Sequence, residues 1–455
     1  MMLDDLFPYS EYKDSGLPYY GQIPTHWKVL RNGQIFSQRN QTGFPDLPIL
    51  EVSLKTGVQV RDFENSKRKQ IMNDREKYKR AAKGDIAYNM MRMWQGAVGV
   101  APVNGLISPA YVVASPFPGV DSRYYSYLFR TQNYMNEVNK YSRGIVSDRN
   151  RLYWDQFKQM PSLFPPSIEQ KKIADFLDNH GRKVSRLIRI KKRQVRLFSE
   201  LKQAIIKKAV TRGINSEIQL KSSGIDWIGD IPEHWTIKRV KTEFICLNYK
   251  RIPLSSAERG LMKVREFDYY GASGVIDKVD EYIFDDELIL LAEDGANLVM
   301  RNLKLAIIAK GKFWVNNHAH ILKPINGNID FLAHLLESID YRPWISGAAQ
   351  PKLTKDRLMG ISIAVPSKDE QDAIASFIEN ETRNLDIAIQ TTLQEIELIT
   401  EYRTRLISDV VTGQIDARNF EIDYLIAEDT GNDEVEENDI DIDNDEVPDL
   451  EECEV

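Results

Sequence analysis

The sequence predicts an α+β protein with two globular modules, two long helices that form an antiparallel coiled coil, and a disordered acidic C-terminal tail. Two internal repeats indicate this architecture. A short motif occurs at 13–31 and again at 221–239, with nine of nineteen positions identical at an offset of 208. A long helical pattern begins near residue 166 and again near residue 366. Because a period near 200 residues is too long for a solenoid of small units, we expect two whole modules with pseudo-two-fold symmetry.

The two repeats divide the chain into five segments. The first module is expected at 1–165, the central helix at 166–213, the second module at 214–365, the distal helix at 366–415 and the acidic tail at 416–455. A chain of 455 residues with 42% hydrophobic content can bury a core in each of two such modules.

Each module begins with the motif Gly-x-Ile-Pro-x-His-Trp. His26 and His234 precede equivalent tryptophans, and packing within the module explains these histidines better than catalysis. The modules are expected to mix strands with helices. Short apolar runs bounded by Gly, Pro and Asp predict strands at 85–88, 111–114, 288–291 and 306–308.

The two long helices have similar ends. Ser167 and Ser367 each stand three residues before Gln or Glu, which fits a capping box, and the patterns end near Gly213 and Gly413. At ~1.5 Å per residue, a helix of about forty residues is ~60 Å long. Apolar residues recur at heptad spacing along both helices. The expected seam residues are Ile173, Leu177, Val184, Leu187, Phe198, Leu201 and Ile205 on the first helix, and Ile374, Ile378, Leu385, Ala388, Ile399, Tyr402 and Leu406 on the second.

Charge favours pairing of the two helices with each other. Residues 169–214 hold 14 basic and 4 acidic side chains, whereas 370–415 hold 3 basic and 9 acidic ones. Opposite charges on heptad helices set partner choice and orientation, so one antiparallel coiled coil is expected. The alternative is two solvated faces that happen to differ.

The net charge of −7 averages two unlike parts of the chain. Residues 416–455 contain 18 acidic side chains and one basic residue, so they carry −17, and the rest of the chain carries −7 + 17 = +10. A segment with this much negative charge is expected to stay disordered. It either solubilises the protein or competes with phosphate for the basic body, which would weaken nonspecific DNA binding.

The sequence offers little sign of catalysis, metal binding or membrane insertion. It contains no Gly-x-x-x-x-Gly-Lys-Ser/Thr loop, no Gly-x-Gly-x-x-Gly turn and no Asn/Asp-Pro-Pro-Tyr/Phe tetrapeptide of amino-methyltransferases. His318-x-His320 lacks supporting ligands, and Cys246 and Cys453 show no metal-ligand spacing. No run of eighteen apolar residues exists, and the N-terminus is acidic, so a soluble cytoplasmic protein without metal or catalytic residues is expected.

Contact with nucleic acid is better supported, because both modules hold clusters of the side chains that read base edges or neutralise phosphates. Any single residue of this kind is more often an ordinary surface residue, so only the clustering counts. The candidate DNA-binding residues are Arg92, Trp94, Gln95, Arg143, Arg149 and Arg151 in the first module, and Arg301, Asn302, Asn316, Asn317, His318 and Lys352 in the second.

These motifs together resemble the specificity subunits of type I restriction-modification systems, over residues 12–415. The matching pieces are Ile-Pro-x-His-Trp at the head of each module, Lys83-Gly84-Asp85-Ile86 through Gly105-Leu106-Ile107-Ser108-Pro109-Ala110-Tyr111, Asp294-Gly295-Ala296, and Pro-x-x-x-Glu-Gln at each long helix.

The resemblance implies that each module is a target recognition domain that reads one half of a split sequence in double-stranded DNA. It also implies that the long helices separate the domains and dock two methyltransferase (M) subunits, with two restriction (R) subunits in the full enzyme. Those partners would perform the chemistry with S-adenosylmethionine, Mg²⁺ and ATP, so this subunit would be non-catalytic and hold no cofactor. The expected docking residues are Ile173, Leu177, Val184, Leu187, Phe198, Leu201, Ile374, Ile378, Leu385 and Ile399.

Two other hypotheses stay open. The chain could be a standalone DNA-modifying enzyme or nuclease with an unrecognised site, or a coiled-coil scaffold without a DNA role. The modules differ strongly at 32–150 and 240–350, as expected for readers of different half-sites. Base-contacting residues therefore cannot be transferred from the family, and the acidic tail is not a feature that the resemblance explains.

Overall fold

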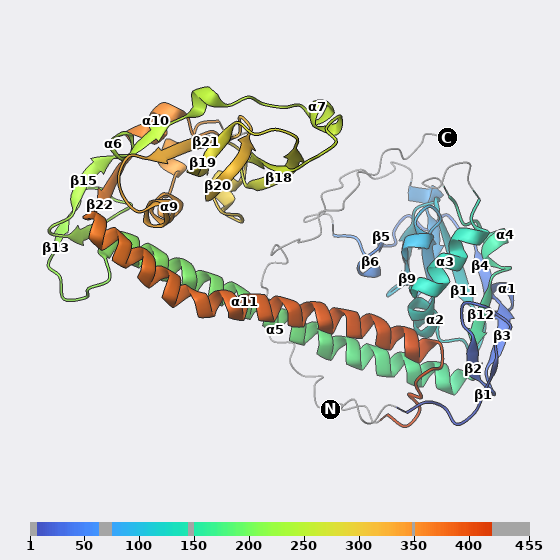
Figure 1. The fold of residues 1–455 in the computed structure, drawn as a ribbon. Helices are drawn as coiled ribbons and strands as arrows, with labels where there is room; N and C mark the ends of the chain where they lie inside the picture. The colour runs from blue at the N-terminus through green and yellow to red at the C-terminus, as the bar shows by residue number, and fades with distance from the viewer. Residues whose placement is uncertain (1–6, 63–74, 144–149, 348–350, 421–455) are drawn as a thin grey trace. The chain divides into compact units, whose positions relative to one another are not determined.

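The computed structural model of the chain describes residues 7–62, 75–143, 150–347 and 351–420 (Figure 1). It confirms the predicted α+β class. Contacts divide the chain into two units, one formed by residues 1–186 and 400–455 and the other by 187–399. Each unit combines one module with adjoining parts of both long helices, and each is described by itself below.

The first unit is built on a four-stranded antiparallel sheet. Its strand order is β4-β11-β8-β9, with β4 at Phe36–Arg39, β11 at Tyr111–Pro116, β8 at Ile86–Asn89 and β9 at Val98–Val100. The two central strands coincide with the predicted runs at 85–88 and 111–114. The side chains of Ile86, Ala87 and Tyr88 are fully buried, which explains why so short a run forms a central strand.

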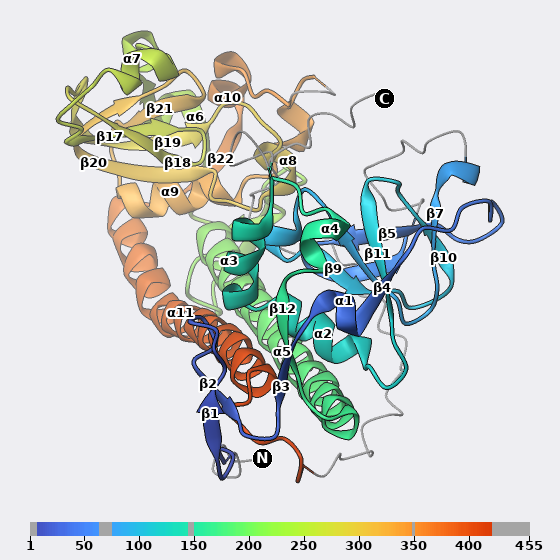
Figure 2. The same cartoon turned by 90° about the vertical axis from the view of Figure 1, so that its right-hand side faces the viewer.

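Smaller elements surround this sheet (Figure 2). The two-stranded pairs are β1 Tyr12–Asp14 with β2 Gln22–Pro24, β3 Lys28–Arg31 with β12 Pro161–Phe164, β5 Leu50–Ser53 with β6 Gly57–Val60, and β7 Lys79–Ala81 with β10 Gly105–Ile107. The short helices are α1 Asn32–Ile35, α2 Ser122–Phe129, α3 Gln132–Tyr141 and α4 Trp154–Phe157, with 3-10 turns at Arg75–Lys77 and Met93–Gln95.

The second unit holds a six-stranded sheet in the order β16-β21-β19-β20-β17-β18, and only β17 and β20 pair in parallel. The strands are β16 Phe244–Cys246, β17 Phe267–Gly271, β18 Gly274–Val279, β19 Phe284–Ala292, β20 Ala306–Val315 and β21 Ala319–Pro324. Further strand pairs are β13 Leu220–Ser222 with β14 Asp230–Pro232, and β15 Thr236–Arg239 with β22 Ser362–Val365. The helices are α6 Val240–Glu243, α7 Ser256–Gly260, α8 Asn297–Met300, α9 Ile329–Ser338 and α10 Lys355–Gly360, with 3-10 turns at Asn248–Lys250 and Arg342–Trp344.

The two sheets share one core topology. The order β4-β11-β8-β9 reappears as β16-β21-β19-β20, and α2, α4 and β12 have counterparts in α9, α10 and β22. Strands β11 and β21 end at a turn that leads into α2 and α9. The first residue after each turn is fixed to a long helix, because Asp121 N and Asn328 N donate to the side chains of Gln170 and Gln371 at 3.0 Å. The strand ends on one side of each sheet therefore face a long helix, and we call this side the helix-facing edge. The strand ends on the other side, the opposite edge, carry the loops where β11 and β21 begin.

The long helices are α5, Ser167–Arg212, and α11, Lys368–Val411. In the second unit, Lys191 of α5 pairs with Glu395 of α11 at 2.7 Å, and Lys202 pairs with Asp386. Because the residue numbers of the partners on α11 decrease as those on α5 increase, the two helices are antiparallel. In the first unit the start of α5 meets the end of α11, where His180 and Tyr402 have ring centroids 5.7 Å apart.

The predicted seam is wrong at two positions of α5. Leu187 and Leu201 are 42% and 50% exposed, whereas Ile188 and Lys202 beside them are half-buried. The seam takes a four-residue step after Val184, and lysine stems occupy two seam positions while their ammonium groups reach acidic residues of α11. An apolar pattern alone could not reveal this register.

The two sequence repeats meet in each unit. In the first, Glu169 of α5 accepts hydrogen bonds from His26 Nε2 at 2.8 Å and Trp27 Nε1 at 2.9 Å. In the second, Glu370 of α11 accepts the same pair from His234 and Trp235, at 2.8 and 3.0 Å. The histidines thus serve module packing, as expected. The predicted capping boxes are incomplete. Ser367 Oγ accepts from Glu370 N at 3.4 Å, but the Glu370 carboxylate bonds to His234 and Trp235. The Gln170 side chain bonds to Pro165 O and Asp121 N.

The C-terminal end of α11 packs against the first module, and the C-terminal end of α5 packs against the second. Gly413, after α11, lies against Pro24 and Trp27, and Gly213, after α5, lies against Pro232 and Trp235. Residues of α11 such as Val410 belong to the core of the first module, and residues of α5 such as Val210 belong to that of the second. The five-segment division of the sequence therefore differs from the compact units, since each core needs both helices.

Candidate nucleic-acid interface

Two predicted clusters of the first module form one group of loops at the sheet edge away from α5. The turn that follows β8 carries Arg92, Trp94 and Gln95. The segment before α4 reaches this turn through a hydrogen bond from Leu152 N to Met90 O at 2.9 Å. The turn at 92–95 and the described ends of the second cluster, Arg143 and Arg151, are distant in sequence but lie on loops that meet at this hydrogen bond.

A short antiparallel bridge shapes the second of these segments. Arg143 and Arg151 exchange backbone hydrogen bonds of 3.0 and 2.9 Å, and both side chains are exposed. The positive charge of Arg143 contributes to a lowered pKa of Asp155, after the larger effect of the hydrogen bond and charge of Lys158. Arg149 lies outside the described residues.

The candidates of the first turn differ in accessibility. Gln95 is exposed and Arg92 is half-buried. Trp94 packs against the module core, and its indole donates to Met91 O at 3.0 Å. Trp94 thus supports the turn, and Arg92, Gln95, Arg143 and Arg151 are the candidates placed to meet a ligand.

The second module repeats this arrangement with different residues. Leu353 N donates to Glu293 O at 2.8 Å, as Leu152 N does to Met90 O. Ser346 and Lys352 form an antiparallel bridge with two hydrogen bonds of 2.9 Å, equivalent to that of Arg143 and Arg151. Exposed Lys352 therefore occupies the place that Arg151 holds in the first module.

A buried polar network underlies these loops in the second module. Glu293 pairs with Arg251, and His320 lies beside them with its Nδ1 accepting from Asn248 Nδ2 at 2.8 Å and its Nε2 donating to Leu353 O at 2.8 Å. Burial lowers the pKa of His320. Burial alone would raise the pKa of Glu293, but the hydrogen bond from Arg251 and the nearby His320 hold it below its usual value.

This network was missed at the sequence level. Arg251 and Asn248 belong to the loop after β16, far in sequence from Glu293, and no motif marks them. Arg251 also donates to the carbonyls of Asn317 and Ala319 at 3.1 and 2.9 Å. It therefore joins the β16, β19 and β21 loops at one edge of the sheet.

Two predicted DNA-binding residues of the second module have structural roles instead. Arg301 adopts a left-handed backbone with φ of 55°, and its guanidinium donates to Ile339 O at 2.8 Å and to Glu337 O beside the end of α9. Asn316 is buried, and its Oδ1 accepts from His318 N at 2.8 Å, which shapes the turn before β21. Both side chains are used in holding loops, so we remove them from the candidate set.

The remaining candidates of the second module are accessible. Asn302, Asn317, His318 and Lys352 are exposed. His318 Nδ1 lies 2.9 Å from both oxygens of Asp294, so the two predicted motifs, Asp294-Gly295-Ala296 and the 316–318 turn, adjoin.

The structure gives no support to a metal reading of His318-x-His320. His320 is held by Asn248 and Leu353, and His318 by Asp294. Within the residues that the structure describes, no three His, Cys, Asp or Glu side chains are grouped as a metal site. In the same part of the chain, every helix is too short or too polar to span a bilayer.

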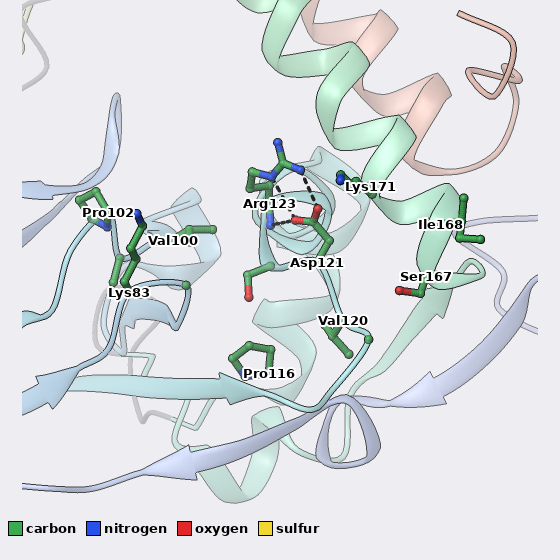
Figure 3. A pocket seen from close by; sticks show the side chains of 14 residues that line it. Lys83, Val100, Pro102, Pro116, Val120, Asp121, Arg123, Ser167, Ile168 and Lys171 are labelled. Carbon is green, nitrogen blue, oxygen red and sulfur yellow. Dashed lines mark hydrogen bonds and ion pairs between the residues drawn. The ribbon is translucent and has the colours of Figure 1, made fainter.

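A hollow of about 590 Å³ lies at the helix-facing edge of the first module (Figure 3). Val100, Pro102 and Val120 line much of it. Arg123 also lines the hollow, but its guanidinium is paired with Asp121 at 2.7 Å and with two aspartates of α5 at 2.8 Å each. Because its central charges neutralise each other, we assign no ligand to this hollow.

The predicted docking residues divide by exposure. Ile173, Leu177 and Val184 of α5 and Ile374 and Ile378 of α11 are buried, so they cannot bind a partner. Phe198, Leu385 and Ile399 are half-buried between the helices. Only Leu187 and Leu201 of the predicted set are exposed. Ile190 and Leu197, which were not predicted, are 54% and 51% exposed on the same helix.

Comparisons with known proteins agree with this architecture. The type I restriction modification DNA specificity domain matches residues 25–196 and 232–398. The putative type I restriction enzyme MjaX specificity subunit of Methanocaldococcus jannaschii is 24% identical over 432 residues, which are 87% of this chain and 95% of that subunit. A putative specificity subunit of Haemophilus influenzae, S.HindORF215P, is 35% identical over 138 residues, only 29% of this chain and 34% of that protein.

A solved structure shares the fold. A chain from work on complex assembly and conformational transition of the type I R-M system aligns with a TM-score of 0.63 at 12% identity, covering 86% of this chain and 98% of that one. The chain belongs to the type I restriction modification DNA specificity family. It is a DNA-recognition subunit of a type I restriction-modification system.

Proposed function

We propose that each module reads one half of a bipartite DNA target with the loops at the sheet edge away from the long helices. The observation that carries this proposal is the shared loop arrangement. In the first module the turn after β8 meets the bridged segment before α4. In the second module the loop after β19 meets the bridged segment before α10, at an equivalent position but with different side chains. An invariant support with variable loops suits two readers of different sequences.

Single substitutions in the two modules test this assignment. Arg151→Ala should weaken recognition at one half-site, by about 1–3 kcal/mol if the arginine contacts a base. Lys352→Ala should affect the other half-site. Methylation mapping of cellular DNA, with the chain expressed beside its methyltransferase, reports both halves at once. Lys207→Ala on α5 is a matched control, and loss at the same half-site from both loop variants would contradict the proposal.

The long helices would dock the methyltransferase subunits. The apolar side chains exposed on α5 support this role: Leu187, Ile190, Leu197 and Leu201 stand at helical spacings of 3, 7 and 4 residues. On α11, Leu398 is 63% exposed at the position equivalent to Leu197. Large apolar side chains grouped on a charged helix are typical of protein interfaces. Two related surfaces would accept two M subunits, with R subunits added in the full enzyme.

A double substitution tests the docking surface. Leu197→Asp with Leu201→Asp should abolish comigration with the methyltransferase subunit in size-exclusion chromatography. Ile276→Asp is the control, because Ile276 is a similarly exposed apolar residue on β18. Retained comigration of the double variant would exclude this face of α5.

The subunit itself would be non-catalytic. Its partners would supply S-adenosylmethionine, Mg²⁺ and ATP with the active sites that use them. Purified chain incubated with DNA and Mg²⁺, or with DNA and a methyl donor, should give no product. Turnover that persists in the purified chain would favour a standalone DNA-modifying enzyme or nuclease instead.

A further inference from the structure

The chain leaves the first module at a fixed point on α5. After Gly413 it stays attached to the module: Ala417 is buried, and Lys172 Nζ donates to Arg418 O at 2.8 Å. The ring of Phe420 then packs edge-on against Phe176 of α5, with centroids 4.6 Å apart. The acidic segment that follows therefore starts directly on the long helix.

A basic face of the helix pair begins at the same point. Lys172, Phe176 and Lys183 are spaced i, i+4 and i+11, so they lie on one side of α5, with Lys183 about 10 Å beyond Phe176. Arg403 of α11 follows Tyr402, whose ring centroid lies 5.7 Å from that of His180 on α5. In agreement with this position, burial and then the charges of Lys183 and Arg403 lower the pKa of His180. Among the described residues, neither Lys183 nor Arg403 forms a salt bridge with an acidic side chain.

The charge of the remaining chain complements this face. Residues 421–455 contain 17 acidic and no basic side chains, whereas residues 1–420 carry −7 + 17 = +10. A chain of 35 residues can reach at most about 115–125 Å when extended, so the distance from Phe420 to Lys183 lies well within its reach. Because it is tethered at Phe420, it meets this face as an intramolecular partner.

We propose that residues 421–455 bind the helix face formed by Lys172, Lys183 and Arg403, and shield it from nucleic acid. Exposed ion pairs are individually weak, so different carboxylates of the acidic segment would pair in turn with Lys172, Lys183 and Arg403. The association is therefore sensitive to salt. The recognition loops lie at the opposite edge of the sheet, so this contact leaves them open. Nonspecific DNA binding along the helices is suppressed while reading of the target is not.

The natural cysteines allow a direct test on the full chain. Cys453 lies near the end of the acidic segment, and Cys246 is buried and can be replaced by Ser. A fluorophore on Cys453 should show high anisotropy at low salt and fall to a free-chain value at high salt. The variant with Lys183→Glu and Arg403→Glu should show the free-chain value at low salt. The variant with Lys207→Glu and Lys208→Glu makes the same charge change elsewhere on α5 and should behave as the wild type.

Crosslinking locates the contact. A cysteine-to-lysine reagent on Cys453 should join it mainly to Lys172 and Lys183. Wild-type anisotropy in the Lys183 and Arg403 variant, or crosslinks concentrated on loop lysines such as Lys352, would overturn the proposal. Equal loss of anisotropy in both charge variants would also overturn it, because it would show attraction by net charge without a specific face.

Discussion

The two modules differ where they would meet DNA and agree where they meet the helices. At the helix-facing edge, a glutamate accepts from a His-Trp pair and a glutamine accepts from the turn before α2 or α9, with distances that match within 0.1 Å. At the opposite edge, the first module has the eight-residue turn 90–97 after β8. The second module has the longer loop 293–305, with α8 and a buried network around Glu293. Attachment is thus held constant while the loops vary.

The matching attachments are not equally buried. Glu169 is 5% exposed and accepts a third hydrogen bond, from the Tyr9 hydroxyl at 2.6 Å. Glu370 is 21% exposed and its partner His234 is 50% exposed. Water can replace a lost partner more readily in the second module, so the same substitution should have unequal effects.

The largest expected effect is on this pair of glutamates. Glu169→Ala should destabilise the first unit by about 3 kcal/mol, because it leaves buried donors on Trp27 and Tyr9 without an acceptor. Glu370→Ala should cost the second unit about 1 kcal/mol. His234 is half-exposed and can be hydrated, and water can reach Trp235 through the partly exposed position that Glu370 leaves. Hydrogen exchange followed by mass spectrometry measures each unit separately. Equal losses would show that burial does not distinguish the two attachments.

The glycines after the long helices give a second matched pair. Gly413 and Gly213 both have φ above +70°, but a Cβ on Gly413 would lie 2.4 Å from Pro24 Cδ, whereas one on Gly213 has its nearest neighbour at 3.5 Å. Gly213→Ala should cost about 1 kcal/mol from backbone strain, and Gly413→Ala should cost about 2–3 kcal/mol because overpacking adds to it. Denaturant unfolding of the two variants compares these costs. A larger loss at Gly213 would contradict the packing described for Pro24.

A smaller difference is expected on acidification. Burial lowers the pKa of His320 and His334 in the second unit and of His180 in the first. Such histidines take up protons more readily when unfolded, so their contribution is complete above about pH 6.5 and is lost as the pH falls toward the folded-state pKa.

Hydrogen exchange at pH 7.5 and 5.5, corrected for intrinsic rates, tests this expectation. The second unit should lose more protection than the first, and His320→Gln should reduce that loss. An unchanged loss in the variant would mean that His320 does not titrate as its burial requires.

Much of the fold could be predicted from the sequence because repeats constrain it twice. The four predicted strands became the central strands of both sheets, and most residues of the apolar runs that marked them are buried. The seam of α5 was only partly predictable. Ile188 fits an apolar pattern as well as Leu187 does, but no apolar pattern selects Lys202 over Leu201. The observed seam depends on Glu395 and Asp386 of α11, which pair with Lys191 and Lys202.

The sequence allowed the loops of the candidate interface to be predicted, but not which of their side chains are available to a ligand. Clusters at 92–95 and 143–151 indicated a surface. The structure joins the turn after β8 to the segment of Arg151 through one hydrogen bond, from Leu152 N to Met90 O. Arg301 and Asn316 looked the same in sequence, yet their side chains hold α9 and a turn. Whether a polar side chain is used internally depends on partners distant in sequence, such as Ile339, and no local pattern reports them.

The central claim is that each module reads its own half of the DNA target. Replacing residues 20–165 with the first module of another family member, and mapping methylated sites in cells that also express the methyltransferase, tests it most directly. The account predicts a new sequence in one half of the target and an unchanged sequence in the other. A change in both halves would contradict it.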